Sequence, residues 1–466
     1  MKKITFLLTL MLSNLITAQT FDVETIYNSG PDDKRLNIVI LGDGYKESEL
    51  NKFILDANSF ANQLFSESPY SEYKNYFNVY AIKVPSKESG ANHPGTATDV
   101  TEPDIPVLVV DNYFGSAFDA YGIHRLLVPN NYMAINNVLA ANFPAYDQVI
   151  MLVNSPFYGG SGGSNLATLS MHPLANQIGI HELGHSFGNL TDEYYAGDQY
   201  AGESTNMTQQ TDPTLVKWSN WINFDNVGIY QHCCGGNSGL WFRPHENCKM
   251  RVLNVDFCPV CKEGTIERIH SLVKPIDSFM PVETSIIAGA EANINFELDL
   301  IETLPTNTLS TTWTLNGAAL NNNAASIAIA TSNLVDGENT LTAVVQDKST
   351  LLRVKNHETI HIYSVQWKIN YDATLGLINS EGLSADSSII AYPNPVENIL
   401  NITFKNPIAG NFAASLYTID GKLIKNVNNS NQKTLKIDME GMNAGIYIVK
   451  YFLDSTYLSS QQIIKK

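Results

Sequence analysis

Two histidines and a glutamate in the segment His181-Glu182-Leu183-Gly184-His185 have the residue types and the spacing of a metal-dependent hydrolase site. Residues four apart on a helix lie on the same face, one turn apart, so both imidazoles can bind one metal ion. The glutamate between them can reach a water molecule held at that ion. This H-E-x-x-H arrangement is typical of zinc peptidases. It predicts His181 and His185 as metal ligands, Glu182 as the catalytic base and Zn²⁺ as the cofactor.

The chain contains the same pattern a second time, at His357–His361. Before the first copy, Pro173 can open a helix, and apolar residues then recur at helical spacing. Around the second copy, β-branched and aromatic residues predict a strand. Four residues along a strand span about 13 Å, which is too far for one zinc ion. We therefore expect the first copy to be the metal site, and His357 and His361 to be surface residues of a strand without a role in catalysis.

The residues around the first copy, from about 21 to 270, mix strand and helix patterns. Buried strands are predicted at residues 36–41, 77–82 and 148–153, a helix at about 47–65, and an edge strand at 166–171. Strands that alternate with helices predict an α/β layer. The glycine-rich stretch at residues 159–164 lacks the lysine of a phosphate-binding loop, so we interpret it as a flexible rim beside a substrate cleft.

After about residue 273 the helix patterns fade and short strands separated by Asn, Gly and Asp turns dominate. Residues 276–367 predict a small immunoglobulin-like β-sandwich. A linker is expected at residues 368–388. A further β unit follows at residues 389–466, with a hairpin cue at Asp420-Gly421.

The whole chain has 466 residues and a net charge of −17, which argues against a nucleic-acid-binding protein. Residues 1–18 are typical of a signal peptide, with Lys2-Lys3, an apolar stretch and small residues before the expected cleavage site. No other segment is long and apolar enough to be expected to cross a bilayer. We expect an exported, soluble protein.

All five cysteines lie between Cys233 and Cys261. Outside the cytoplasm this favours local disulfides, with one thiol left over because the number is odd. A structural zinc site is the alternative, since the spacing of Cys258 and Cys261 also suits metal ligands. The pairing cannot be deduced from the sequence.

Three stretches resemble the IgA-peptidase family of zinc endopeptidases, and the resemblance spans roughly residues 20–270. The stretches are Leu41–Tyr45, His181–Tyr194, and Arg243-Pro244 with Asn247–Arg251. The resemblance implies a metzincin-like fold in which a methionine turn lies beneath the metal. Met250 is the candidate for this turn, and an ordinary core methionine is the alternative. The predicted fold class is thus an α/β (α+β) zincin-type catalytic domain at residues 19–273, followed by two small all-β sandwich domains.

The chain departs from the usual metzincin string H-E-x-x-H-x-x-G-x-x-H at its last position, where Thr191 stands in place of histidine. The resemblance therefore implies a carboxylate as third metal ligand. We predict Asp192, because it is the nearest carboxylate after Gly188, which can end the helix in a left-handed turn. Glu193 is the alternative. Nothing in the sequence identifies the group that stabilises the oxyanion, and Tyr194 and its neighbour Tyr195 are interpreted as packing residues.

The last residues resemble the C-terminal sorting domain of the type IX secretion system. The resemblance is carried by Tyr392–Pro395, Asp420-Gly421, Gly445–Tyr447 and Lys465-Lys466. It implies passage through the periplasm and across the outer membrane, with the secretion machinery as a partner and a final location at the cell surface or outside the cell. A small binding sandwich is the alternative.

Taken together, these features predict a secreted zinc-dependent endopeptidase that acts on proteins or peptides. Two alternatives are a non-catalytic exported binding protein and a zinc hydrolase acting on a non-peptide amide or ester. The sequence does not disclose the preferred peptide bond.

Overall fold

The structure is a computed structural model, and it describes residues 20–99, 107–288, 292–355, 357, 361–371, 389–404, 411–419, 421–430, 434–454 and 456–466. The predicted signal peptide at residues 1–18 and most of the predicted linker at 368–388 lie outside these residues. The chain divides into two units, which are described separately. The first contains residues 1–284, 295–328 and 340–367, and the second contains residues 285–294, 329–339 and 368–466.

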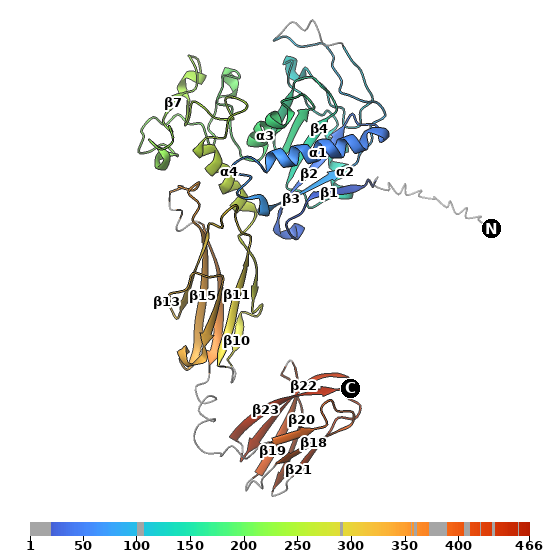
Figure 1. Cartoon of the computed structure of the whole chain (residues 1–466), viewed down its shortest axis with the longest axis vertical. Coiled ribbons are helices and arrows are strands. Elements are labelled where there is room, and N and C mark those ends of the chain that lie inside the picture. The colour runs from blue at the N-terminus through green and yellow to red at the C-terminus, as the bar shows by residue number, and fades with distance from the viewer. Residues whose placement is uncertain are drawn as a thin grey trace, which may run out of the picture. The chain divides into compact units, whose positions relative to one another are not determined.

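A six-stranded sheet lies at the centre of the first unit (Figure 1). Its strands are β1 (Val23–Tyr27), β2 (Leu36–Asp43), β3 (Phe77–Ile82), β4 (Gln148–Val153), β5 (Gly160–Gly163) and β6 (Leu166–Ser170). Their order is β1-β3-β2-β4-β6-β5, with parallel pairing between β3, β2, β4 and β6 and antiparallel pairing of the edge strands β1 and β5. The three predicted buried strands are β2, β3 and β4, so that prediction is confirmed.

Helices cover both faces of this sheet. The helices of the described residues are α1 (Leu50–Leu64), α2 (Tyr132–Asn142), α3 (Ala175–Ser186) and α4 (Pro259–Leu272). In β2, Ile38 and Ile40 face the hydrophobic core that includes α1, α3 and α4, whereas Val39 and Leu41 face the core that includes α2. The central strands are therefore buried on both sides, which accounts for their continuous apolar sequences.

Asp43 ends β2 and connects the sheet to the long irregular segment that follows β3. Its buried carboxylate accepts hydrogen bonds from the backbone amides of Phe114 and Ser116, at 3.0 and 2.9 Å. The next residue, Gly44, has a φ of +71°, and a Cβ atom there would lie 2.1 Å from the carbonyl oxygen of Gly90. Only glycine fits this close approach. The motif at residues 41–45 thus anchors the segment that continues to the candidate site.

The glycine-rich stretch at residues 159–164 contains the edge strand β5, and Gly160 to Gly162 line the cavity of the candidate site, so the predicted rim is an edge strand and its flexibility stays a prediction. The predicted edge strand at 166–171 is β6, which lies between β4 and β5. The backbone of β5 pairs with β6 and also passes very close to α3. A Cβ atom on Gly162 would lie 2.4 Å from the carbonyl oxygen of Glu182. The glycines permit this packing, because a side chain could not fit between the strand and the helix.

Residues 276–371 form two β-sheets. The strands are β9 (Ile276–Met280), β10 (Ser285–Ile287), β11 (Asn293–Leu300), β12 (Leu309–Leu315), β13 (Ala318–Leu320), β14 (Ser326–Ala330), β15 (Gly337–Asp347) and β16 (Ile362–Tyr371). Their orders are β14-β11-β9 and β10-β16-β15-β12-β13. Trp313 and Trp367 are fully buried and stack with ring centroids 5.9 Å apart. A β region is present as predicted, and its immunoglobulin-like type stays a prediction.

The last strands, all in the second unit, form two further antiparallel sheets. They are β17 (Ile389–Tyr392), β18 (Ile399–Phe404), β19 (Asn411–Thr418), β20 (Leu423–Ser430), β21 (Thr434–Asp438), β22 (Gly445–Leu453) and β23 (Thr456–Lys465). The sheet orders are β17-β18-β21 and β20-β19-β22-β23. Their apolar side chains form a separate core that includes Leu400, Leu416 and Val449. The pairing of β19 with β20 confirms the predicted hairpin.

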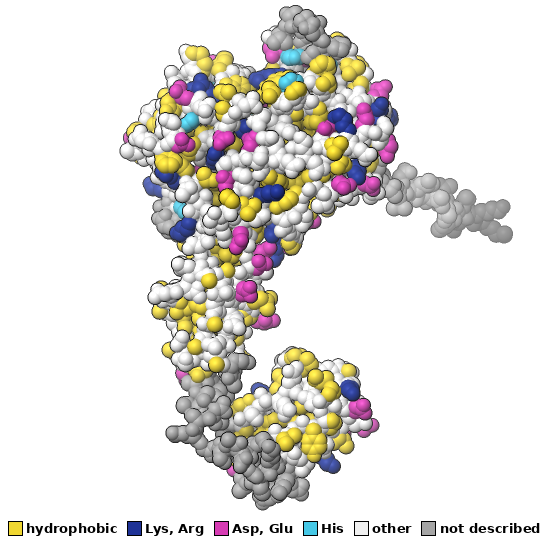
Figure 2. Space-filling view, in the orientation of Figure 1, with side chains coloured by type: hydrophobic (Ala, Val, Ile, Leu, Met, Phe, Trp, Pro, Cys, Tyr) yellow, Lys and Arg dark blue, Asp and Glu magenta, His cyan; other side chains and the backbone are white. Residues whose placement is uncertain are grey.

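Charged side chains are scattered over the visible face of the first unit in Figure 2. Figure 2 shows acidic and basic side chains interspersed with apolar ones on its visible face. Among the residues that the structure describes, no helix is long and apolar enough to span a membrane.

Candidate metal centre and active-site cavity

Helix α3 carries both histidines of the first H-E-x-x-H segment on one face, as predicted. Ile180 and Leu183 are buried in the hydrophobic core on the other side of the helix. This packing turns His181 and His185 away from the core, with ring centroids 4.9 Å apart in an edge-to-face arrangement. The apolar stripe of the helix therefore determines where the two imidazoles point.

Asp192 meets the two histidines after the chain reverses at the end of α3. Its Oδ1 atom lies 3.1 Å from Nε2 of His181 and 3.2 Å from Nε2 of His185. The residue with the left-handed backbone is Asn189, at φ 52°, so the prediction that Gly188 takes this conformation is wrong. Asparagine tolerates this region because its short side chain can bond locally.

Both imidazoles are held by hydrogen bonds from their other nitrogen. Nδ1 of His181 lies 2.9 Å from the carbonyl oxygen of Lys249, and Nδ1 of His185 lies 2.8 Å from that of Leu190. A carbonyl can only accept, so each Nδ1 carries the proton and each Nε2 of a neutral ring presents a lone pair. Two lone pairs and the carboxylate oxygen of Asp192 then converge, which is unfavourable unless a cation lies between them. Imidazole nitrogens oriented in this way, with a carboxylate, fit a zinc ion.

The pKa values of His185 and Asp192 also indicate that a positive charge between these groups is favourable. Burial alone would lower the pKa of His185, but the Asp192 carboxylate and Glu182 raise it to about 9. Burial alone would raise the pKa of the Asp192 carboxyl, but the two imidazoles hold it well below its usual range. A proton can therefore supply the missing charge when no metal is bound.

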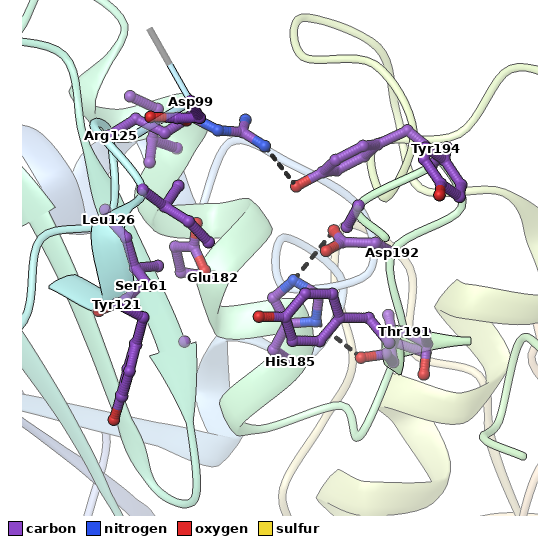
Figure 3. A pocket seen from close by; sticks show the side chains of 18 of the residues that line it. Asp99, Tyr121, Arg125, Leu126, Ser161, Glu182, His185, Thr191, Asp192 and Tyr194 are labelled. Carbon is purple, nitrogen blue, oxygen red and sulfur yellow. Dashed lines mark hydrogen bonds and ion pairs between the residues drawn. The ribbon is translucent and has the colours of Figure 1, made fainter. Parts of the chain in front are cut away.

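Glu182 faces a cavity of about 570 Å³ beside the histidines (Figure 3). Burial raises the pKa of its carboxyl. Other side chains that line this cavity include Tyr121, Arg125, His185, Asp192 and Tyr194. A second cavity of about 410 Å³ adjoins it and is lined by His181, Lys249 and Arg251. Both cavities share Arg125, Glu182 and Tyr194, so open space extends to either side of the glutamate.

Arg125 and Tyr194 approach each other across the site from opposite walls (Figure 3). The Arg125 guanidinium donates a hydrogen bond of 3.1 Å to the Tyr194 hydroxyl and lies 5.4 Å from the centre of its ring. The interpretation of Tyr194 as a packing residue is therefore wrong, and Tyr195 is more than half exposed. Sequence reasoning missed Arg125, which no motif marks. The position of Arg125 at the cavity depends on the long segment that Asp43 anchors.

Glu193 points away from the histidines, so the structure brings only Asp192 to them. The Glu193 carboxylate is fully buried and lies near Cys248, Cys258 and Cys261. Met250 lies beneath α3, where a Cβ atom on Gly184 would be 2.6 Å from its sulfur. Met250 thus packs directly against helix α3, and its identification as a methionine turn stays a prediction.

Neither His357 nor His361 lies in a strand, so the predicted strand context of these two histidines is wrong. Strand β16 starts only at Ile362, and the amide of His361 donates to the carbonyl of His357, four residues earlier. The two rings lie 5.1 Å apart, and His361 is buried. However, His361 pairs with Glu267 at 2.6 Å, whereas His357 lies 2.5 Å from the carbonyl oxygen of Asp347. Nε2 of each ring thus has its own protein partner, and the local preference for a strand is overridden by these contacts.

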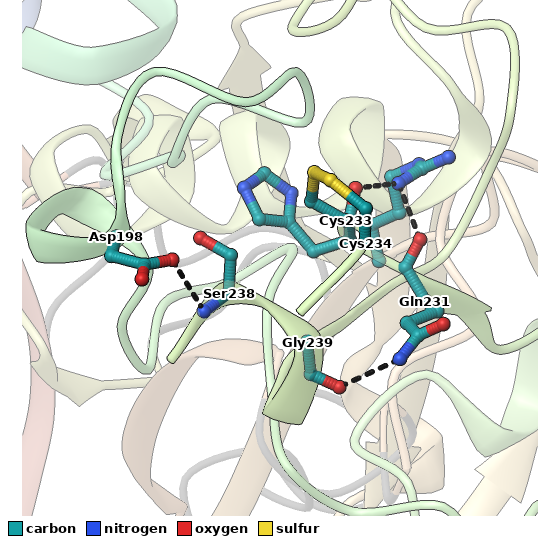
Figure 4. Close-up of a disulfide and its surroundings, with 8 residues drawn as sticks. Asp198, Gln231, Cys233, Cys234, Ser238 and Gly239 are labelled. Atoms are coloured by element: carbon teal, nitrogen blue, oxygen red, sulfur yellow. Dashed lines mark hydrogen bonds between the residues drawn. A yellow bond between two sulfur atoms is a disulfide. The ribbon is translucent and has the colours of Figure 1, made fainter. Parts of the chain in front are cut away.

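The cysteines divide into one pair and one cluster. Cys233 and Cys234 form a disulfide beside Arg243, whose guanidinium donates to the carbonyls of Gln231 and His232 (Figure 4). The other three cysteines are buried thiols rather than disulfides. The expected set of local disulfides is therefore restricted to two neighbouring residues.

Comparison with known proteins identifies two regions. Residues 24–227 match the family described as IgA Peptidase M64, and residues 390–466 match the secretion system C-terminal sorting domain. The resembling stretch at residues 243–251 lies beyond the matched region. A comparison with curated proteins finds no match.

Several solved structures share weak similarity with parts of the chain. Fibronectin(III)-like modules of Clostridium thermocellum CbhA show 9% identity over 40% of this chain and 92% of that chain, with a TM-score of 0.17. Bacteroides uniformis β-glucuronidase 3 shows 8% identity over 49% of this chain and 28% of its own, with a TM-score of 0.15. A two-domain fibronectin type-III segment of chicken tenascin shows 10% identity over 38% of this chain and 93% of that chain, with a TM-score of 0.15. Scores this low support no conclusion about fold or function.

The two matched regions indicate the families that the two ends of the chain resemble. M64 peptidases are metallopeptidases, and the sorting domain marks proteins exported by type IX secretion to the cell surface or the extracellular space. Residues 24–227 of this chain are thus similar to the IgA peptidase M64 family, and residues 390–466 to the type IX sorting domain.

Proposed function

We propose that this protein is a secreted zinc-dependent endopeptidase. His181, His185 and Asp192 would hold the zinc ion, and Glu182 would act as general base. The observation that carries the proposal is that the Nε2 atoms of both histidines lie within 3.2 Å of one Asp192 carboxylate oxygen, beside a cavity that Glu182 also lines. Two nitrogen ligands and one oxygen ligand leave a coordination position open, as in catalytic zinc sites.

In the proposed reaction, a bound zinc ion would polarise the scissile carbonyl and acidify the attacking water. Glu182 accepts a proton from that water and then delivers it to the leaving amine. The burial of Glu182 supports this role, because burial raises the pKa of its carboxyl and so favours the protonated form that delivers a proton to the leaving amine.

Arg125 and Tyr194 are proposed to stabilise the negative charge that develops on the carbonyl oxygen. Both line the same cavity as Glu182, and both present hydrogen-bond donors. Donors that are already oriented before the reaction lower its barrier most effectively. Their mutual hydrogen bond would be exchanged for bonds to the substrate.

A peptide is favoured as substrate because an edge strand lines the cavity. The backbone of Gly160 in β5 faces away from β6 and bonds to Arg125 and Leu127. Since strand residues alternate, the backbone of Gly162 faces the same side, beside the cavity. An extended peptide could pair with such an edge. The cavities on both sides of Glu182 support cleavage within a chain rather than at its end.

A zincin-type topology of the catalytic region is part of this proposal. The sheet, the helix α3 above β5 and β6, and Met250 beneath Gly184 support it. The proposed catalytic region comprises residues 19–273.

The test combines metal analysis with protein hydrolysis by the full mature chain. We expect casein cleavage that a chelator abolishes and Zn²⁺ restores. Glu182→Gln should retain the metal but lose at least roughly a hundredfold in kcat, because the general base is removed. Glu47→Gln, at an exposed glutamate, serves as the control. Cleavage of esters but not of casein would favour a non-peptide hydrolase, and metal binding without any hydrolysis would favour a binding protein.

A further inference from the structure

Three cysteines and one glutamate form a second cluster of potential metal ligands behind the candidate active site. The ligand atoms of Glu193, Cys248, Cys258 and Cys261 all lie within 4.8 Å of one another, and all four residues are buried. The Oε2 atom of Glu193 is buried without a hydrogen-bond partner. An unpaired carboxylate oxygen in such a setting is costly unless a cation compensates it.

The separations within the cluster fit tetrahedral zinc coordination. With Zn–S bonds of about 2.3 Å, two sulfurs bound to one tetrahedral ion lie about 3.8 Å apart, and a sulfur and a carboxylate oxygen about 3.5 Å apart. The observed separation of the Cys248 and Cys261 sulfurs is 3.6 Å, and that of the Cys261 sulfur and Glu193 Oε1 is 3.3 Å. Thiols in simple contact can also approach this closely, so the decisive feature is that four ligand atoms converge.

The start of helix α4 would stabilise negative charge on two of the three sulfurs. Cys258 immediately precedes the 14-residue helix α4, and Cys261 lies in its first turn. The positive end of the helix dipole stabilises negative sulfur at these positions. The amide of Cys258 donates to the Cys248 sulfur at 3.3 Å, and the Asn206 side chain donates to Glu193 Oε1 at 2.9 Å.

We propose that Cys248, Cys258, Cys261 and Glu193 bind a structural zinc ion, separate from the proposed catalytic one. All four coordination positions are filled by protein, which distinguishes this site from one that must admit water and substrate. Binding would deprotonate the thiols and tie three chain segments together: the segment after α3, the segment around Met250, and the start of α4.

This second site would support the first through two short connections. Glu193 follows Asp192 directly, and its amide donates to the Met250 carbonyl at 2.8 Å. Lys249, which follows Cys248, supplies the carbonyl that orients His181. The structural ion would therefore hold in position both the carboxylate and the carbonyl on which the histidine cluster depends.

A disulfide is the competing state, since the protein is exported. Any disulfide among these three cysteines would consume two sulfurs and leave one buried thiol beside the Glu193 carboxylate. Zinc instead uses all four groups at once. The two states differ in both metal content and free thiols, so they can be distinguished directly.

The first experiment measures zinc and thiols in the full-length chain, purified without chelator or reductant. We expect two zinc ions per chain and three thiols that titrate after denaturation in a chelator. One zinc ion with a single thiol would overturn the proposal, because it would mean that two of the cysteines are bridged. This measurement requires no variant, so it does not depend on whether variants fold.

The second experiment replaces zinc with Co²⁺ and records the near-ultraviolet sulfur-to-cobalt charge-transfer absorption. The histidine site contains no sulfur, so this absorption reports the cysteine cluster alone. It should persist in the double variant His181→Ala/His185→Ala and disappear in Cys258→Ser/Cys261→Ser. The double variant Cys233→Ser/Cys234→Ser, which removes two cysteines outside the cluster, is the matched control.

These results also separate the two metal proposals. If the histidine site proves empty or inactive, the cobalt–sulfur absorption should still be present. Its absence from the wild-type chain would refute the structural site and leave the proposed peptidase function untouched.

Discussion

The carboxylates of Asp192 and Glu193, neighbours in the chain, face two different clusters of metal-binding side chains. Oδ1 of Asp192 lies 3.1 Å from Nε2 of His181, whereas Oε1 of Glu193 lies 3.3 Å from the Cys261 sulfur. One dipeptide therefore connects the candidate catalytic centre to the buried cysteine cluster. This arrangement gives each acid a distinct expected role, and the two roles can be tested separately.

Asp192→Asn should remove one of three protein ligands of the proposed catalytic zinc ion. Zinc affinity at the histidine site is expected to fall at least roughly a hundredfold, and hydrolysis should fall with it. The cobalt–sulfur absorption should remain. Glu193→Gln should instead weaken the cysteine site while the histidines still meet Asp192. If Glu193→Gln alone abolished zinc binding at the histidine site, the ligand identities would have to be exchanged.

Arg125 and Tyr194 should affect turnover more than substrate binding. Arg125→Met removes the charge but keeps much of the side-chain volume, and Tyr194→Phe removes only the hydroxyl. We expect each to lower kcat by roughly a hundred- to a thousandfold, the range found when oxyanion donors are removed, with a smaller change in KM. Tyr132→Phe, at an exposed tyrosine that lines neither cavity, is the control. A rise in KM with unchanged kcat would show that these residues only bind substrate.

The central sheet and the two histidines could be predicted because the relevant information is local. Strands β2, β3 and β4 are buried on both faces, so each is mostly apolar rather than alternating between apolar and polar residues. Helix α3 combines helical periodicity with ligands four residues apart, and these two patterns agree. Asp192 could be named from its distance along the chain after α3.

The remaining features depend on contacts between distant segments, which no local pattern encodes. Arg125 reaches the cavity through a segment that the Asp43 carboxylate holds. The role of Glu193 becomes visible only when three cysteines converge on it. Around His361, β-branched residues favour a strand, yet the partners Glu267 and Asp347 hold the histidines differently. Local preference fails where tertiary partners are stronger.

Asp347 should make the stability of the first unit sensitive to acid. The residue is fully buried and accepts hydrogen bonds from Tyr73, Thr308 and His270, at 2.5, 2.7 and 3.0 Å. Burial alone would raise its pKa, but these partners lower it to about 2. The unfolded value is near 3.9. Because the folded pKa is the lower one, the stabilisation is complete above about pH 4 and is lost as the pH falls towards 2.

The expected size of this effect is on the order of 2 kcal/mol in the free energy of unfolding. Urea unfolding of the wild type and of Asp347→Asn should therefore differ most above pH 4, and the difference should shrink as the pH falls. Asp299→Asn, at an exposed aspartate in the same β region, is the control. A difference that did not depend on pH would mean that the Asp347 carboxylate is not the source of the stabilisation.

The sorting domain should be required for export but not for catalysis. Its apolar core consists only of residues between 389 and 463, so truncation before Ile389 opens no core elsewhere in the described chain. The truncated protein should retain the kcat and metal content of the full chain. In the native host it should accumulate in the periplasm, because the domain that marks the protein for type IX secretion is missing. Fractionation of cells that express either form, with activity measured in each fraction, tests this. Delivery of the truncated chain to the cell surface at the normal level would show that another part of the protein directs its export.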